Sequence, residues 1–554
     1  MSHQLKNLLA ERVASGLKRK SITRPSKWAE NYRIMGGSSF PGQWSFKYHP
    51  WLKEMHDSEA TINIGQKAAQ MGFTELVLNL VFFQMDIKGS DCLYILPSKT
   101  PDASDFSASR FDSAVELSPH LERMFSDVKN VGHKRAGSAN LYIRGSQSKS
   151  GLKSIPVSFI VMDEVAEMNQ ENIALALERT SGQRSKLCWK ISTPTVENLN
   201  INRDYNLSSK EEFFFTCPSC SRHTHLVFPD CLKIVGENIL DPRIVESHLI
   251  CKECQNILPQ ENKWEWLESG FWVPAHKERA DRGFHISQLY SSTVTPAEIA
   301  KSYFKSLSDP TEEQELYNSK LGLCHTVEGA RISDKIIDDC ISEHHIDDNP
   351  PSDSIITMGV DVGPKWNHFW IDQWFLAKNQ PIIDLNMQTI CKTLKYGKVQ
   401  TFGELYALML KYNVRHCIID AQPERRLARE FAMRFYGLVH LCFYGKGITG
   451  KCINVDDNPV EPKITVDRTS WLDQSLGRFH QRTIRLPMEI DQEFRDHMKA
   501  LVRVYQKDSD GNPVGAYVKG ENDPDHYAHA RNYSEIALNF AYAHAGNQNI
   551  RRVI

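Results

Sequence analysis

Apolar and polar positions alternate along the chain in two separate series. The first runs from about residue 61 to 194, where the apolar runs CLYILPS, PVSFIVMDE and KLCWKISTP are separated by amphipathic segments such as FSASRFDSAVELS. The second contains SIITMGVDVG, HFWIDQWFLA, VRHCIIDAQ and LVHLCFYGKG, and it ends in the long helical segment HYAHARNYSEIALNFAYAH. Short apolar strands separated by helical segments are typical of parallel α/β sheets. The pattern therefore predicts two α/β domains.

A polar stretch, EHHIDDNPPSDS, separates the two series and shows no core pattern. Its clustered Asp and Pro residues predict the main domain boundary near residue 350. We expect an N-terminal segment over 1–45, a first domain over 46–345 with an inserted module over 213–258, a second domain over 350–545 and a tail over 546–554. A chain of 554 residues is too long for one hydrophobic core, which agrees with this division.

Composition is that of an ordinary globular protein, with 41% apolar residues and a formal net charge of −2. There is no overall basic excess, although 66 Lys and Arg residues can still be concentrated in one groove that binds nucleic acid. The N-terminus has no apolar signal region and no apolar run approaches the length of a membrane span, so we expect an intracellular protein without membrane contact.

The segment GQKAAQMGFT is close to the phosphate-binding motif G-x-x-x-x-G-K-[ST]. Gly72 and Thr74 occupy the second Gly and the hydroxyl positions, but Phe73 takes the place of the lysine. Lys67 lies five residues before Gly72 and can supply the cation from the other side of the turn. We expect Lys67, Gln70, Gly72 and Thr74 to bind ATP. The alternative is that Lys67 is a solvated turn residue.

The run PVSFIVMDEV delivers Asp163 and Glu164 at the end of an apolar strand. In a nucleotide site the first would hold Mg²⁺ through water and the second would orient the attacking water. Taken alone, the pair has the ordinary alternative of acidic turn residues. The order of a P-loop-like turn, this strand, and a strand that ends in Ser192 and Thr193 is that of a translocating ATPase, in which these two hydroxyls couple nucleotide state to movement.

Two CxxC pairs, Cys217 with Cys220 and Cys251 with Cys254, are separated by thirty residues. In a reducing compartment, four thiolates at such spacing favour a structural tetrahedral Zn²⁺ over disulfides. Four buried free cysteines are the alternative. Three nearby histidines could compete as ligands, but surface positions on strands are the simpler reading for His223, His225 and His248.

Three aspartates in the second series have the placement of a two-metal nuclease site. Asp361 and Asp420 each end an apolar strand, and Asp525 opens the last helix. Carboxylates gathered in this way can hold two Mg²⁺ or Mn²⁺ ions for phosphodiester hydrolysis. Each also has a plain alternative as a turn or N-cap residue, and Asp525 most of all. Other polar residues of this half have structural alternatives that we favour: Asp372 in the neighbouring strand, and His526 and His529 on the last helix.

Basic residues offer two further hypotheses. A group with helical spacing follows Asp420 and could track DNA, although a charged helix face is usually only solvated: Arg425, Arg426, Arg429 and Arg434. Three arginines between the P-loop-like turn and the Asp-Glu strand are candidates for an arginine finger: Arg110, Arg135 and Arg144.

Several of these stretches together resemble the large terminase subunit of tailed bacteriophages, in its lambda-like branch. The resemblance rests on a lysine displaced to the front of the P-loop with an aromatic in its usual place, and on KISTPTVEN, CPSC…CKEC and GFHISQLYSS. It covers about residues 25–545. It implies an α/β fold, namely a P-loop ATPase domain with an inserted zinc ribbon followed by an RNase H-like nuclease domain. In DAQPE and DHYAHARNYSEIAL the chain looks closer to terminases of other phage groups, which affects the assignment of Asp525 most.

The resemblance implies a motor that uses ATP, Mg²⁺ or Mn²⁺, and Zn²⁺ to package double-stranded DNA in the cytoplasm of the bacterial host, and that cuts the DNA concatemer. Its implied partners are a small terminase subunit, contacted through residues 1–45, the portal of the procapsid, and further copies of the chain in a ring. A helicase or restriction-type translocase with a fused nuclease is the alternative, but the cysteine pairs stand where helicase motifs would follow. A non-enzymatic DNA-binding assembly protein is a third possibility, against which Asp163 and Glu164 argue.

Overall fold

The chain folds into two compact units, Met1–Val327 and Glu328–Ile554. The structure, a computed structural model, describes residues 22–550 apart from residues 38, 126–127, 154, 327–328, 348–349, 352–353, 377–382, 446–447, 508–512 and 521–522. The division falls before the polar stretch near residue 350, and helix α13 (Asp334–Asp338) packs on helices of the second unit. Among the described residues, no helix combines the length and the apolar character needed to span a membrane.

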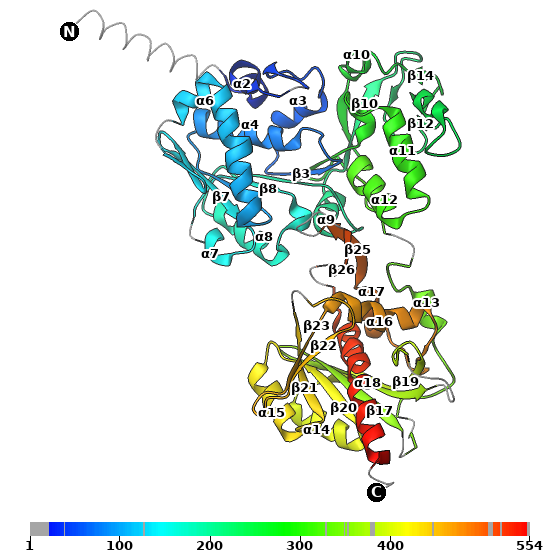
Figure 1. Ribbon diagram of the computed structural model, residues 1–554. Coiled ribbons are helices and arrows are strands. Elements are labelled where there is room, and N and C mark those ends of the chain that lie inside the picture. Colours follow the sequence, from blue (N-terminus) through cyan, green and yellow to red (C-terminus); the bar gives the residue numbers. More distant parts are fainter. Residues whose placement is uncertain are drawn as a thin grey trace, which may run out of the picture. The chain divides into compact units, whose positions relative to one another are not determined.

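A largely parallel sheet forms the centre of the first unit (Figure 1). Its described strands follow the order β11-β10-β16-β3-β9-β8-β4-β7-β6-β5, with β15 paired to β10. Their bounds are β3 Ile62–Lys67, β4 Cys92–Leu96, β5 Val128–Asn130, β6 His133–Ala136, β7 Ala139–Gly145, β8 Phe159–Asp163, β9 Leu187–Ser192, β10 Glu211–Thr216, β11 His223–Thr224, β15 Phe271–Pro274 and β16 Arg282–Ile286. The strand β9 lies between β3 and β8 and is parallel to both, so the ends of all three open on the same edge.

Helices cover this sheet, and the most buried of them is α4 (Phe73–Ile87), which is apolar on nearly every side. The others are α2 Pro25–Tyr32, α3 Trp51–His56, α5 Ser113–Leu117, α6 Pro119–Met124, α7 Lys149–Leu152, α8 Gln170–Leu177 and α9 Asn200–Leu207; short helical turns span Lys99–Ala103, Phe106–Asp112, Val165–Glu167 and Glu178–Thr180, and a two-strand ladder joins β1 Ile34–Met35 to β2 Gly42–Gln43. Helix α2 packs on α3 and α4 through the buried Trp28, so the described part of the predicted N-terminal segment belongs to this unit.

The cysteine pairs lie in a small region that is continuous with the large sheet. The predicted inserted module over 213–258 begins inside β10, which pairs in parallel with β16. The remaining elements of this region and its helical cover are β12 Leu232–Lys233, β13 His248–Ile250, β14 Ile257–Leu258, α10 Lys263–Leu267, α11 Pro296–Ser306 and α12 Pro310–Glu315, with short helical turns at Pro242–Glu246, Gln288–Tyr290 and Leu316–Leu321. This region is therefore an outgrowth of the sheet edge.

The second unit is built on a mixed sheet with the order β22-β23-β21-β20-β17-β18-β19-β24. Strands β17, β18 and β19 form an antiparallel meander, whereas β20 and β21 are parallel to β17. The bounds are β17 Ile355–Val362, β18 Asn367–Leu376, β19 Thr389–Val399, β20 His416–Asp420, β21 Val439–Tyr444, β22 Ile453–Asp456, β23 Lys463–Val466, β24 Ile484–Arg485, β25 Val502–Lys507 and β26 Pro513–Val518, the last two forming a separate hairpin. This is the strand arrangement of the RNase H fold, which confirms the predicted fold class.

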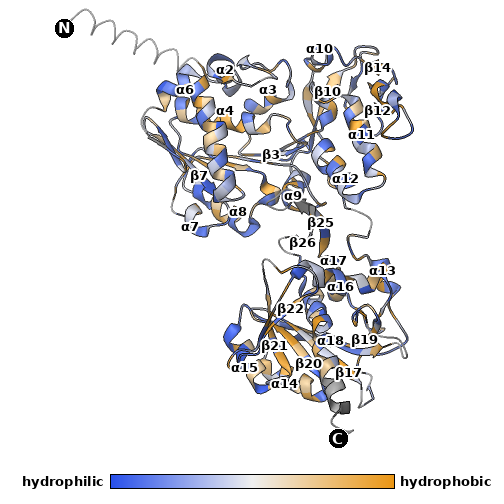
Figure 2. Cartoon of the chain, in the orientation of Figure 1, coloured by the Kyte–Doolittle hydropathy of each residue, from blue (hydrophilic) through white to orange (hydrophobic). Residues whose placement is uncertain are grey.

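Helices α14 (Phe402–Lys411), α15 (Arg425–Arg434), α16 (Arg468–His480), α17 (Gln492–Lys499) and α18 (His526–Ile550) complete the second unit. Helix α18 crosses the sheet and packs on β17, β18 and β20. Figure 2 shows the region of β17 and β20 as largely hydrophobic. The approach is so close at Gly359 that a Cβ atom there would lie 2.0 Å from the carbonyl oxygen of Ala530. Only glycine fits, and the contact fixes the start of α18 beside the end of β17.

Candidate functional site

The P-loop-like segment is the connection between β3 and α4. Lys67 is the last residue of β3, and the loop that follows uses left-handed backbone at Gln70 (φ 60°) and Gly72 (φ 84°). Gly72 directly precedes the first residue of α4. The N–H groups at the start of a helix have no partner within the helix, and they favour an anion. The loop thus keeps the backbone geometry of a phosphate site although its usual lysine is absent.

Lys67 is not a solvated turn residue. Its side chain is only 7% exposed, and its Nζ atom lies 3.0 Å from Oε1 of Glu164, which follows the end of β8, two strands away in the sheet. Phe73, which holds the usual lysine position, is buried against Gly65. The amino group of Lys67 is therefore the cation that faces this edge of the sheet, and the aromatic ring of Phe73 belongs to the core.

Glu164 connects the ends of three strands. It adopts a left-handed backbone (φ 62°) directly after β8, its Oε1 atom binds Lys67, and its Oε2 atom accepts a 3.3 Å hydrogen bond from the Ser192 hydroxyl at the end of β9. The Ser192 hydroxyl is fully buried and also accepts a hydrogen bond from the Ala166 N–H group. A movement of the Glu164 side chain would therefore alter the hydrogen bond of Ser192 and affect the adjoining Thr193.

Asp163 is buried beside this chain of contacts. Its Oδ2 atom accepts a 2.6 Å hydrogen bond from the Tyr94 hydroxyl, whereas Oδ1 is buried and accepts no hydrogen bond within the described part of the chain. Burial, and then the charge of Glu164, raise the pKa of Asp163 to about 6, although Lys67 and Tyr94 act in the opposite direction. A carboxylate with a buried, unpaired oxygen is suited to a cation.

A cavity of about 310 Å³ adjoins the loop at Gln70 and Gly72. Aromatic rings from the segment before α3 form much of its wall: Phe40 stacks on Tyr48 with ring centroids 4.6 Å apart, and His49 meets Phe40 edge-on. Burial lowers the pKa of His49 to about 4, so its ring is neutral at physiological pH. The sequence analysis missed this wall because none of its residues belongs to a phosphate-binding motif.

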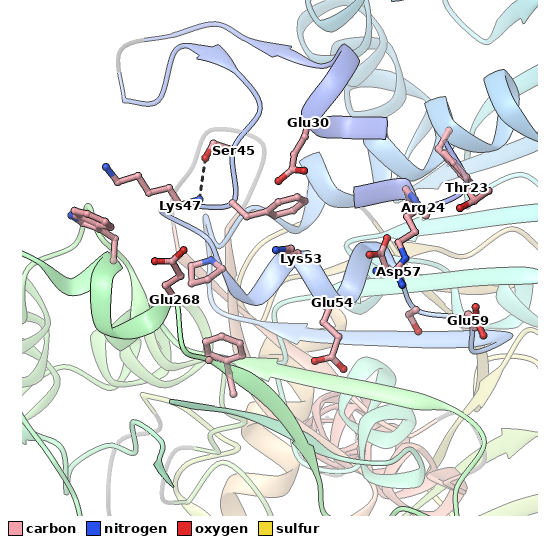
Figure 3. A pocket seen from close by; sticks show the side chains of 18 of the residues that line it. Thr23, Arg24, Glu30, Ser45, Lys47, Lys53, Glu54, Asp57, Glu59 and Glu268 are labelled. Carbon is pink, nitrogen blue, oxygen red and sulfur yellow. Dashed lines mark hydrogen bonds between the residues drawn. The ribbon is translucent and has the colours of Figure 1, made fainter. Parts of the chain in front are cut away.

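A larger hollow of about 1000 Å³ lies elsewhere in the first unit and contains none of the predicted site residues. Figure 3 shows that acidic and basic side chains alternate around it, among them Lys53, Glu54 and Asp57. Several are already engaged: Glu54 pairs with Arg282, and Lys47 lies 3.8 Å above the ring of Trp264. Although this hollow is larger than the cavity beside Gln70 and Gly72, it is not the nucleotide site, because none of the predicted nucleotide-binding residues lines it.

The three candidate finger arginines lie in different settings. Arg110 is exposed and pairs with Glu75 of α4 at 3.2 Å. Arg135 and Arg144 donate to backbone carbonyl groups around the β6–β7 hairpin, at Gly137 and Ile143 respectively.

The four cysteines of the CxxC pairs come together, with all sulfur atoms within 4.8 Å of one another. Each pair forms the same turn: the Ser221 N–H group donates to the Cys217 carbonyl, and the Gln255 N–H group donates to the Cys251 carbonyl. Both donors have left-handed backbone, at φ 57° and 61°. Two matching turns with converging thiols are compatible with a tetrahedral metal site.

The histidines near these cysteines lie outside the group. His225 stacks on Phe214, His223 is exposed on β11, and the ring of His248 faces the Glu246 carbonyl group.

In the second unit the three predicted aspartates lie around the start of α18. Asp361 and Asp420 occupy equivalent positions at the ends of the adjacent parallel strands β17 and β20. Burial, and then the charge of Asp361, raise the pKa of Asp420 to about 7. Asp525 directly precedes α18, and it contacts Lys519 at 2.5 Å and His529 at 3.2 Å. Burial alone would raise the pKa of Asp525, but these two basic partners outweigh it and lower the pKa.

Two histidines lie close to Asp361, although the sequence analysis assigned neither of them to this site. Among the described residues, Asp361, His368 and His526 form a group whose ligand atoms lie within 4.8 Å, and Asp420 and Asp525 stand outside that group. The Nδ1 atom of His526 donates a 2.8 Å hydrogen bond to Asp361 Oδ2, and this hydrogen bond raises the pKa of His526. His368 lies directly opposite Asp361 in the ladder of β17 and β18.

The remaining polar residues singled out in the sequence have other partners. Asp372 is fully buried and accepts hydrogen bonds from Trp370 and Ser534. On α15, Arg425 pairs with Glu461 and Arg426 with Glu430.

Comparisons with known proteins agree along both units. The model of the ATPase domain of the phage terminase large subunit gpA matches residues 38–272, and the model of the gpA endonuclease domain matches residues 281–411. No curated protein matched the chain.

Among solved structures, the large terminase of bacteriophage HK97 matches with a TM-score of 0.50 at 12% identity, over 92% of this chain and 98% of that one. The ATPase domain of the large terminase of Thermus phage P74-26, as its R139A mutant, matches over 50% of this chain and 93% of that one, with a TM-score of 0.32 and 12% identity. The large terminase nuclease of thermophilic phage G20c matches over 36% of this chain and 94% of that one, with a TM-score of 0.23 and 13% identity.

The two family models together cover more than half of the chain, in the order in which the two units occur. They favour a terminase over a helicase or a restriction-type translocase, and an enzyme over a passive assembly protein. The chain therefore belongs to the gpA family of phage terminase large subunits, and it is an ATPase and endonuclease of viral DNA packaging.

Proposed function

We propose that the β3–α4 loop and the ends of β8 and β9 form the site where ATP is hydrolysed to move DNA. The observation that carries this proposal is the contact chain from Lys67 through Glu164 to Ser192. It places a cation, an acidic side chain and a buried hydroxyl at the ends of three neighbouring parallel strands. Together they supply the parts that phosphoryl transfer requires.

In this proposal Lys67 binds the β- and γ-phosphates, and the backbone from Gln70 to Thr74 cradles them. Phosphate competes with Glu164 for the amino group of Lys67, so binding of ATP releases Glu164. The freed carboxylate then orients the attacking water. Because Ser192 donates to the same carboxylate, its hydrogen bond changes with the nucleotide, and Thr193 passes that change along the chain.

Asp163 would hold the Mg²⁺ ion of the nucleotide. Its Oδ1 atom accepts no hydrogen bond within the described part of the chain, and burial and Glu164 raise its pKa in spite of Lys67, so the carboxylate would gain from a bound cation. When bound, the ion neutralises charge on the phosphates. The aromatic wall of Phe40, Tyr48 and His49 beside Gln70 would take the adenine base, since stacked rings and a neutral imidazole suit a flat heterocycle.

For the nuclease we propose that Asp361, Asp420 and Asp525 hold Mg²⁺ or Mn²⁺. Half-buried Asp420 has no Lys or Arg partner among the described residues, and burial and the charge of Asp361 raise its pKa. Divalent ions at such a site stabilise the attacking and leaving oxygens of the phosphodiester. The exposed arginines of α15 would contact the DNA backbone, with Arg429 and Arg434 as the first candidates.

We further propose that Zn²⁺ binds Cys217, Cys220, Cys251 and Cys254 and stabilises that part of the first unit. The partners would be double-stranded DNA, a small terminase subunit that contacts residues 1–45, the portal of the procapsid and further copies of the chain in a ring. Residues 1–21 of the proposed contact lie outside the described residues. The place of action would be the cytoplasm of the bacterial host.

The ATP site can be tested by separating binding from hydrolysis. Glu164→Gln should bind a fluorescent ATP analogue with nearly unchanged affinity but lose DNA-stimulated ATP hydrolysis by about 100-fold or more, because only the water-orienting step is removed. The matched control is Glu167→Gln, an exposed neighbour in the following turn. Hydrolysis by Glu164→Gln at the rate of the control would refute the assignment.

A further inference from the structure

Three histidines from different elements meet beside the nuclease aspartates. His368 on β18 stacks on His526 of α18, with ring centroids 4.4 Å apart and ring planes within 8°. His497 on α17 lies 5.4 Å from the first ring and 5.5 Å from the second. Imidazole rings gathered at such distances, next to carboxylates, are typical of metal sites.

One ring nitrogen of His368 in this cluster has no hydrogen-bond partner among the described residues. The residue is 5% exposed, and its Nδ1 atom is buried without a hydrogen-bond partner in the described part of the protein. A buried polar nitrogen without a partner costs free energy comparable to a lost hydrogen bond. His526 differs, because its Nδ1 atom is already bonded to Asp361. The Nδ1 atom of His368 is therefore available to a ligand, whereas the Nδ1 atom of His526 is already engaged with the Asp361 carboxylate.

Glu493 and His497 supply the other side of this space. They lie four residues apart on α17 and thus share one face of the helix. The ligand atoms of His368, Glu493 and His497 lie within 4.8 Å of one another. We propose that these three residues bind a transition-metal ion of the Zn²⁺ class, at a site separate from the carboxylates assigned to the nuclease.

The donor set decides the class of metal. Two imidazoles and one carboxylate suit Zn²⁺, Co²⁺ or Ni²⁺, whereas Mg²⁺ prefers oxygen ligands and keeps much of its water. The three aspartates of the neighbouring site supply only oxygens. The unit would then distinguish two kinds of ion by ligand chemistry over a short distance.

Both imidazoles are buried, with His368 5% and His497 3% exposed. On coordination, His497 would lose the long 3.3 Å hydrogen bond that its Nδ1 atom accepts from the Tyr527 N–H group; its Nε2 atom lies 3.9 Å from Glu493 Oε1. That loss is small beside the gain from a metal ligand bond.

The ammonium group of Lys398 contacts Glu493, and a metal cation would compete with it for this carboxylate. Lys398 lies opposite His368 in the ladder of β18 and β19, and its ammonium group is 2.6 Å from Glu493 Oε1. An ion that binds Glu493 would compete with this ammonium group for the carboxylate, so Lys398 would limit the affinity. An open hollow lined by Lys398, Glu493 and Tyr527 adjoins the site and leaves room for water or a phosphate oxygen on the ion.

Zinc titration of the full chain tests the proposal, with the metal content measured by mass spectrometry after dialysis. The wild type should hold about two Zn²⁺ ions per chain, one at the four cysteines and one at this site. His368→Ala combined with His497→Ala should lose one ion, Glu493→Gln should bind it at least about tenfold more weakly, and Lys398→Gln should bind it more tightly. His480→Ala, an exposed histidine on α16, is the matched control.

The variants also separate this site from its neighbours. Asp361→Asn should lose DNA cleavage and keep this Zn²⁺ ion, whereas Cys217→Ser should lose only the other ion. Glu493 is partly exposed, so Glu493→Gln should preserve the fold even if the double histidine variant does not. Unchanged zinc affinity in Glu493→Gln, or a wild type whose only ion disappears with Cys217→Ser, would overturn the proposal.

Discussion

The two catalytic centres balance the charge of their carboxylates in different ways. In the first unit Lys67 lies inside the site and is bonded to Glu164. In the second unit the buried arginines pair elsewhere: Arg478 and Arg531 each contact Glu535 at 2.6 Å. Among the described residues Asp361 pairs with His526 and with no Lys or Arg, and burial and Asp361 raise the pKa of Asp420 to about 7, whereas Asp525 contacts Lys519.

This difference explains what each centre requires. In the proposed ATPase centre Lys67 is bonded to Glu164, and a ligand phosphate would take this cation, so nucleotide binding would rearrange an existing ion pair. In the proposed nuclease centre Lys519 contacts Asp525, but Asp361 and Asp420 have no Lys or Arg partner among the described residues, and added Mg²⁺ or Mn²⁺ would balance their charge. In this proposal the first site changes an ion pair with the nucleotide, and the second binds added metal ions.

The largest effect is expected from breaking the nuclease side. Asp361→Asn and Asp420→Asn should each reduce Mn²⁺-dependent cleavage of plasmid DNA by about 1000-fold, because the charge that holds the ions is removed. DNA-stimulated ATP hydrolysis should stay within a few-fold of wild type. Asp456→Asn, an exposed carboxylate of the same unit, is the control. If Asp361→Asn cut as fast as this control, the assignment would fail.

Breaking the ATPase side should give the reciprocal result. Lys67→Ala should lower the ATPase rate by roughly 100-fold to 1000-fold, the scale for losing one preorganised contact to transition-state charge. Cleavage of DNA in Mn²⁺ should persist, since its ligands belong to the other unit. Lys186→Ala, at an exposed position before β9, serves as the comparison. An ATPase rate for Lys67→Ala within a few-fold of wild type would exclude the displaced lysine.

A third change sharpens the comparison by addressing the buried ions of the second unit. Glu535→Gln leaves Arg478 and Arg531 without their shared partner, and it should lower the free energy of unfolding of that unit by about 3–5 kcal/mol. Denaturant unfolding followed by the tryptophans of the unit measures this. A loss below about 1 kcal/mol would mean that the ion cluster is not a stabilising element.

The same residue gives the pH dependence of that stability. Burial alone would raise the pKa of Glu535, but the charges of Arg478 and Arg531 outweigh it and lower the pKa from 4.5 to about 2. A carboxyl group with a lowered pKa in the folded state contributes stability that is complete above pH 4.5. This contribution should disappear as the pH falls from 4.5 towards 2, and Glu535→Gln should lack it.

The smallest effect on either activity is expected from the cysteine group. Cys217→Ser or strong chelation should destabilise the region around β10–β14, because a small region with short strands takes folding energy from its metal. The nuclease of the other unit should keep its melting temperature and its cleavage rate. Limited proteolysis followed by mass spectrometry would locate the new cleavage sites. Purified protein with no zinc at these thiols would contradict this prediction.

The strand endings were predictable from the sequence, since Asp163, Asp361 and Asp420 each follow an uninterrupted apolar run and such runs become buried strands. The RNase H arrangement followed from family resemblance and not from the pattern itself. Side-chain contacts between residues far apart in the chain were not predictable. Glu164 is 97 residues from Lys67, and no local motif predicts their ion pair. The sequence analysis did not single out His368, although a histidine opposite a carboxylate-bearing strand end is a usable signal.

The sequence analysis missed the aromatic wall of Phe40, Tyr48 and His49 for a related reason. Aromatic residues in a loop are indistinguishable from core residues until the loop is placed against Gln70 and Gly72. The short helix at Asp334–Asp338, near the start of the second unit, is too short to show a core pattern in the sequence.

The central claim is that Lys67 replaces the usual P-loop lysine by exchanging Glu164 for phosphate. A structure of the full chain with Mg²⁺ and a non-hydrolysable ATP analogue measures this directly, through the two distances from Lys67 Nζ. We predict that Nζ lies about 3 Å from an oxygen of the β- or γ-phosphate and has left Glu164. An analogue bound at the β3–α4 loop while Lys67 keeps its 3.0 Å contact with Glu164, and reaches no phosphate, would contradict the claim.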